Sequence, residues 1–176
     1  MRKLVITRPE SSEYAPYYAG YIAKVPKGDI LQLLRDQQDS TLWLLENLPE
    51  LTGEYRYATG KWSVKEVLGH VIDGERVFAY RALRIARGDK TPLPGFEQDD
   101  YVANGNFNDR PLKHLQGEYQ AIRTATIALF EPLTAEAWMR TGTASGNIFS
   151  VRALAWAIAG HELHHLGILK DKYGIK

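Results

Sequence analysis

The 176-residue chain contains no cysteine, almost no net charge and no long uninterrupted apolar run. The lack of cysteine excludes disulfides, thiolate metal sites and a cysteine nucleophile. With 22 basic and 21 acidic residues, the chain has no field that would attract nucleic acid or an anionic membrane surface. No segment reaches the roughly 18 apolar residues of a membrane span, and the first residues lack the apolar stretch of a signal peptide. We therefore expect a cytoplasmic protein with a small-molecule partner.

The composition favours a single globular domain over residues 1–176, because hydrophobic residues make up 44% and charged residues 24%. Residues 1–26 carry three prolines among several tyrosines and glycines, which predicts an ordered arm that wraps over other elements.

Four segments have the three- and four-residue apolar spacing of a helix. The first begins near Asp29 and ends at Pro49; the second has Ser63 as N-cap, in an S-x-x-E capping box, and stops at Gly88. The third follows Asp109 and stops before Pro132. The last starts at Ser150, and its stripe is Leu154, Ile158, His161, His165, Ile168 and Lys172.

No segment has a convincing strand pattern. Thr134–Arg140 could form a short helical turn, and residues 141–147 have the composition of a loop. Residues 88–110 form a long irregular connection, for which a surface crossover and a lid over a cleft are equally good interpretations. The pattern predicts an all-α four-helix bundle with long crossover loops that does not follow a simple up-down-up-down path.

Three of the five histidines lie between residues 161 and 165. His161 and His165 are four apart, so in a helix both rings point the same way, on the face that the apolar stripe reserves for the core. His70 lies beside the core side of the second helix, where a bundle can bring it against the other two. Three neutral imidazoles can hold zinc or nickel and leave a coordination position open, although each histidine could instead be an ordinary hydrogen-bonded core residue.

His161 to His165 also match H-E-x-x-H, in which Glu162 would be the base of a metalloprotease. Proteases of this kind need a sheet beside the motif helix, and the chain offers none. Glu162 remains the candidate catalytic residue, with a supporting contact to a ligand histidine or a solvated surface position as the alternatives. His164 is expected to be an ordinary residue at the edge of the site, and His114 to lie on the surface.

Two sequence segments resemble the DinB-like, or YfiT-like, family of metal-dependent enzymes: KWSVKEVLGHVIDGER at 61–76 and GHELHHLGIL at 160–169. The resemblance extends to the PGFEQDDY loop ending at Tyr101 and to the tyrosine-rich arm. It implies a four-helix bundle in which His70, His161 and His165 bind zinc or nickel in a cleft at one end, and it implies a homodimer.

The resemblance implies thiol transfer or hydrolysis, and a non-enzymatic role of the metal site is a further possibility. The first function is that of a thiol S-transferase that joins a low-molecular-weight thiol of the bacillithiol type to an electrophile. The alternatives are a metal-dependent hydrolase and a non-catalytic metal-binding stress protein.

Overall fold

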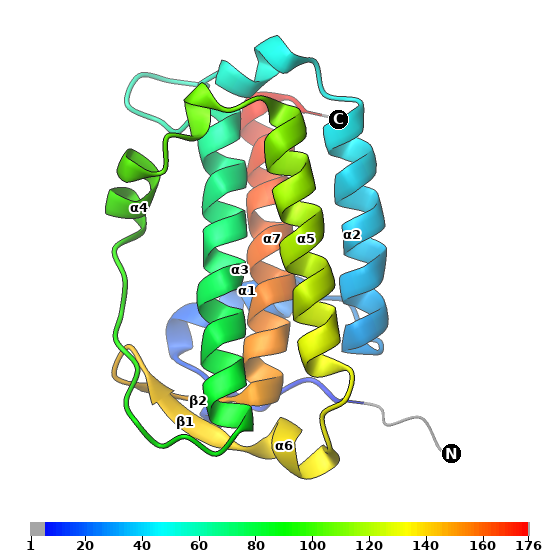
Figure 1. Ribbon diagram of the computed structural model, residues 1–176, viewed down its shortest axis with the longest axis vertical. Helices are drawn as coiled ribbons and strands as arrows, with labels where there is room; N and C mark the ends of the chain where they lie inside the picture. The colour runs from blue at the N-terminus through cyan, green and yellow to red at the C-terminus, as the bar shows by residue number, and fades with distance from the viewer. Residues whose placement is uncertain (1–5, 176) are drawn as a thin grey trace.

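The computed structural model describes residues 6–175, which form a four-helix bundle (Figure 1). Its long helices are α2 (Ile30–Glu46), α3 (Val64–Ala86), α5 (Leu112–Phe130) and α7 (Val151–Tyr173). Helix α7 packs against α3 and α2, and α5 packs against the same two helices from the other side. In Figure 1, α2 and α7 run in one direction and α3 and α5 in the other, so the predicted departure from an up-down-up-down path is confirmed.

Side-chain caps fix the starts of the two helices that carry the histidines. The Ser63 hydroxyl accepts a hydrogen bond from the Glu66 N–H at 3.1 Å, and the Glu66 carboxylate accepts one from the Ser63 N–H at 2.6 Å. This confirms the capping box. Ser150 caps α7 in the same way through the Ala153 N–H.

The connection after α3 carries the chain back along the bundle, which is why α3 and α5 are parallel (Figure 1). It contains the short helix α4 (Gln98–Asn104), which packs on α3, and a 3-10 turn at Phe107–Asp109. The crossover interpretation is thus confirmed, and a lid movement stays a prediction.

The N-terminal arm wraps over the bundle as expected. Residues 6–26 include two 3-10 turns, Ser11–Glu13 and Pro16–Tyr18, and helix α1 (Ala19–Lys24), which lies across α7. An ion pair between Arg152 and Glu13 fastens the arm to the start of α7. Residues 1–5, where part of the predicted arm falls, lie outside the described residues.

Two sequence predictions are wrong, namely that residues 141–147 form a loop and that the chain has no strands. Strands β1 (Thr141–Ala144) and β2 (Asn147–Ser150) form an antiparallel hairpin after the short helix α6 (Ala135–Met139), which Thr134 caps. Ser145 and Gly146 both have positive φ angles, 51° and 74°, as a tight two-residue hairpin turn requires. Strands of four residues are too short to show an alternation of apolar and polar residues in the sequence. The hairpin instead depends on tertiary packing, such as that of Gly142 on Ile85.

Buried apolar residues form two clusters, one toward each end of the bundle. On α7 the second cluster includes Leu169 and Tyr173, and the first includes Val151, Leu154, Ala155, Trp156, Ile158 and Ala159. On this helix, the buried residues His161, Glu162 and His165 lie between the two sets. The predicted stripe fails at its last position, because Lys172 is exposed and Tyr173 is buried instead. Among residues 6–175, no helix has the length and apolar character needed to cross a bilayer.

Candidate metal centre

His70 from α3 and His161 and His165 from α7 meet in the interior of the bundle. One ring nitrogen from each of these residues, here called the histidine triad, lies within 4.8 Å of the others, and the Nε2 atoms of His70 and His161 are 2.9 Å apart. All three side chains are buried, at 3%, 6% and 8% exposure. The structure therefore brings together the three residues that the sequence nominated.

The triad lies away from the ends of the long helices. His70 is about two turns into α3, and His161 and His165 are near the middle of α7. The expectation of a site at one end of the bundle is therefore corrected, because the second apolar cluster fills that end.

Two glycines allow close packing around His161, one against its ring and one against the N-terminal arm. A Cβ atom on Gly74 would lie 2.8 Å from His161 Cε1, so only glycine lets α3 approach the imidazole this closely. On the other side, a Cβ on Gly160 would lie 2.2 Å from the carbonyl oxygen of Tyr21 in α1. The arm thus crosses α7 in direct backbone contact, one residue before the first ligand of the helix.

Aromatic rings surround the triad and exclude water from much of it. Tyr21 and Phe78 each meet the His161 ring edge-on with centroids 5.7 Å apart, and Trp62 lies 5.0 Å from the His70 ring. His164 is only partly buried and packs against Tyr21 outside the triad. His114 is exposed, as predicted.

Burial keeps the triad uncharged. Removal from water lowers the pKa of His70 to about 4 and of His165 to about 3, and lowers that of His161 well below its usual value. Charge repulsion between neighbouring histidines also lowers the pKa values of His161 and His165. At His70, the nearby Asp99 carboxylate opposes the lowering of the pKa. At neutral pH all three rings are in the form that can donate a lone pair to a metal ion.

The donor set fits a divalent ion. Three nitrogens bound tetrahedrally to zinc at about 2.0–2.1 Å are about 3.3 Å apart, which lies within the 2.9–4.8 Å range of the triad. Within residues 6–175, no fourth histidine, aspartate or glutamate joins this group. Three protein ligands with a free position are the arrangement of catalytic rather than structural zinc sites.

Two large cavities adjoin the triad, and a third, of only about 10 Å³, is lined by His165 and Glu162. The first, here called the tyrosine cavity, has a volume of about 290 Å³ and is lined by Tyr17, Tyr18 and Tyr21 together with His70 and His161. The second, here called the tryptophan cavity, has about 340 Å³ and is lined by residues that include Tyr57, Trp62, Tyr173 and His165. Asp99, in the first turn of α4, borders both cavities.

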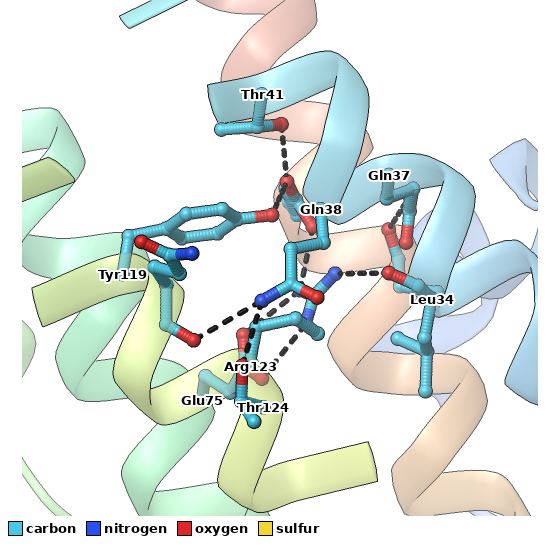
Figure 2. A network of polar contacts seen from close by, with 11 residues as sticks. Leu34, Gln37, Gln38, Thr41, Glu75, Tyr119, Arg123 and Thr124 are labelled. Carbon is cyan, nitrogen blue, oxygen red and sulfur yellow. Dashed lines mark hydrogen bonds and ion pairs between the residues drawn. The ribbon is translucent and has the colours of Figure 1, made fainter. Parts of the chain in front are cut away.

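Glu162 belongs to a buried polar network on another face of α7, and Figure 2 labels its partners Thr41, Tyr119 and Arg123. Its Oε1 accepts hydrogen bonds from Thr41 of α2 and Tyr119 of α5, both at 2.6 Å, and its Oε2 accepts one from Arg123 at 2.6 Å. The side chain is 1% exposed, so a solvated surface position is wrong. A catalytic role for Glu162 stays a prediction, and its three partners bind the carboxylate toward α2 and α5.

Arg123 is the centre of that network. Its guanidinium donates two hydrogen bonds to Glu75, both at 2.8 Å, and one to the Leu34 carbonyl at 3.1 Å (Figure 2). The two carboxylates hold the pKa of Arg123 well above its usual value although burial opposes this. Sequence reasoning missed Arg123 and Glu75. Their helical spacing could have indicated burial, because Arg123 lies four residues after Tyr119 and Glu75 four after Val71, each on a core-facing row.

The fold and the histidine triad define a helical-bundle protein with a candidate three-histidine metal site, and the comparisons agree. The sequence profile of the DinB superfamily matches residues 33–169. The chain therefore belongs to the DinB superfamily. No curated protein gave a significant match to the sequence.

Solved structures with the same fold include YfiT from Bacillus subtilis, described as a probable metal-dependent hydrolase with an unusual four-helix bundle topology. It is 16% identical, with a TM-score of 0.68 over 93% of this chain and 95% of YfiT. A mycothiol-dependent maleylpyruvate isomerase is 15% identical, with a TM-score of 0.65 over 82% of this chain and 61% of the isomerase. The DinB-like protein YjoA from Bacillus subtilis is 24% identical, with a TM-score of 0.57 over 81% of this chain and 87% of YjoA.

Proposed function

We propose that the chain is a metal-dependent thiol S-transferase that joins a low-molecular-weight thiol of the bacillithiol type to an electrophile. The observation that carries this proposal is the pair of cavities at the triad, because a transferase needs room for two substrates. A divalent ion, zinc or nickel, held by the triad would supply the chemistry of keeping a thiol deprotonated. The chain has no cysteine of its own.

The protein residues would position the substrates and keep water out. The rings of Tyr21 and Phe78 cover the His161 side, and Trp62 covers the His70 side. Asp99 borders both cavities and is exposed, so its carboxylate can take up the thiol proton and pass it to solvent. The fold of the mycothiol-dependent isomerase supports the use of a small thiol in this architecture.

The test is conjugation by the reconstituted protein. Protein loaded with zinc or with nickel is mixed with bacillithiol and a panel of electrophiles such as 1-chloro-2,4-dinitrobenzene, and conjugates are measured by mass spectrometry. We expect conjugate above the uncatalysed background, and its loss in His161→Ala but not in the surface variant His114→Ala. Background rates with every electrophile and both metals would refute the proposal.

The second candidate is a hydrolase, favoured by the position of Asp99 close enough to His70 to affect its pKa. In that reaction the carboxylate would take a proton from the attacking water, and no thiol would be needed. Ester or amide turnover without thiol, abolished by a chelator and lowered in Asp99→Asn, would select this function. Chelator-insensitive turnover would exclude it.

A non-catalytic metal-binding stress protein is the third candidate. A site of that kind is usually closed by four protein ligands, whereas three potential ligands and two adjoining cavities favour an enzyme. We also propose the homodimer that the family resemblance implies. Light scattering should give twice the mass of one chain, and a monomeric mass at micromolar concentration would exclude it.

A further inference from the structure

Three aromatic rings from the arm form part of the wall of the tyrosine cavity, beside Phe78 and Phe96. Tyr17, Tyr18 and Tyr21 pack edge-to-face with centroids 5.2–6.0 Å apart, and the hydroxyls of Tyr17 and Tyr21 are 3.1 Å apart. A tyrosine side chain is neutral at physiological pH, because its ordinary pKa is about 10. The rings therefore offer π faces and hydroxyl oxygens without charge.

The rim of the same cavity is acidic. Glu97 and Asp99 line it, both exposed, and neither forms an ion pair with any residue between 6 and 175. No lysine or arginine lines the cavity. Arg81 lies behind the aromatic wall, over the Phe96 ring at 5.9 Å and close enough to Tyr18 to oppose the rise in that residue's pKa, which burial causes. Its side chain is buried and donates to the Pro94 carbonyl and the Ser145 hydroxyl.

Helix stabilisation gives a simpler reason for acidic residues here, because carboxylates in the first turn of a helix interact favourably with its dipole. Asp100 occupies the same first turn of α4 but does not line the cavity. It therefore has the helix-stabilising role without the cavity role. Packing of the arm on the core accounts for Tyr18, whose ring meets those of Phe78 and Phe149. It does not account for Tyr17, which is exposed and lines the cavity.

We propose that the tyrosine cavity binds the positively charged nitrogen of a co-substrate that carries an amine or quaternary ammonium group. Aromatic faces and carboxylates together are the chemistry that recognises such cations. Because a metal ion at the triad would repel the ammonium, the charged nitrogen belongs near Tyr17 and Glu97, with the reacting part of the molecule toward His161. This inference rests on the proposed function and assigns the substrate class of one of its two cavities.

Choline chloride and 3,3-dimethylbutan-1-ol test the inference directly, because they have the same shape and differ in the charge. Calorimetry measures the binding of each to metal-free and to zinc-loaded protein, at constant ionic strength and without thiol. We expect choline to bind roughly tenfold more tightly than the neutral alcohol in both forms.

Glu97→Gln and Tyr17→Ala should each weaken choline binding roughly three- to tenfold, and Glu97→Gln should leave the alcohol unchanged. Asp100→Asn, the matched control in the same helical turn, should leave both affinities within about twofold. All three residues are exposed, and thermal unfolding checks that the variants are folded.

Equal affinity for the two probes, no binding of either, or equal losses in Glu97→Gln and Asp100→Asn would overturn the inference. Choline binding that disappears on zinc loading would also overturn it, since the carboxylates would then serve the charge of the metal. The assay contains no thiol and measures no conjugation. Its failure is therefore separate from failure of the transferase proposal.

Discussion

Replacing Arg123 by methionine should destabilise the protein strongly, because this arginine is the only cation of the buried network described above. The substitution keeps most of the side-chain volume but removes four hydrogen bonds, which reach Glu75, Glu162 and the Leu34 carbonyl. The two carboxylates, which are 2% and 1% exposed, then remain in the core without a positive partner.

The expected cost follows from that burial. Removing one partner of a buried ion pair costs about 3–5 kcal/mol, because the remaining charge is left uncompensated. For a chain of this length, 1 kcal/mol corresponds to a change in Tm of about 2–4 °C. Arg123→Met should therefore lower the Tm by on the order of 10 °C.

Urea unfolding of metal-free protein, followed by circular dichroism at pH 7, measures this cost. Arg35→Met is the matched control, because Arg35 pairs with Glu131 at 2.7 Å on the surface. Exposed pairs of this kind contribute about 0–1 kcal/mol. If both variants lose less than about 1 kcal/mol, the network contributes no more than a surface pair and the reasoning is wrong.

Three further predictions concern the triad. Single alanine substitutions of its histidines should each lower the zinc content measured by mass spectrometry, with His114→Ala unchanged as the control; unchanged content in all three variants would refute the site. Gly74→Ala should displace the His161 ring and weaken zinc binding, whereas Gly117→Ala, with open space around its Cβ, should leave zinc binding unchanged and stabilise the helix by about 0.5–1 kcal/mol. In metal-free protein, burial lowers the pKa of His70 from 6.5 to about 4, so the stability it contributes is complete above pH 6.5 and is lost as the pH falls toward 4. Urea titrations from pH 7 to pH 4 measure this loss, and it should be smaller in His70→Ala.

Local signals made most of the fold predictable. Ser63 and Ser150 are the N-caps that the sequence indicated, because a cap depends only on residues within one turn. The pair His161 and His165 could be recognised for the same reason, and His70 from its place on the core side of its helix.

The remaining features depend on contacts between distant segments. A charged residue such as Arg123 is ordinarily read as exposed, and only its pairing with Glu75 and Glu162, far away in the sequence, makes its burial tolerable. The crossing of the arm over Gly160 is likewise invisible in the sequence, because a glycine inside a helix does not show which segment approaches it.

Because the arm supplies part of the cavity wall and the helices supply the histidines, substrate preference and metal binding could change independently in evolution. The match to the family begins at residue 33 and includes all three histidines, whereas Tyr17, Tyr18 and Tyr21 precede it. A lineage could therefore exchange this short N-terminal segment and acquire a different substrate preference while inheriting the same metal centre unaltered. Backbone contact at Gly160 sets the limit on such exchanges, since any new segment must still cross α7 at the same close distance.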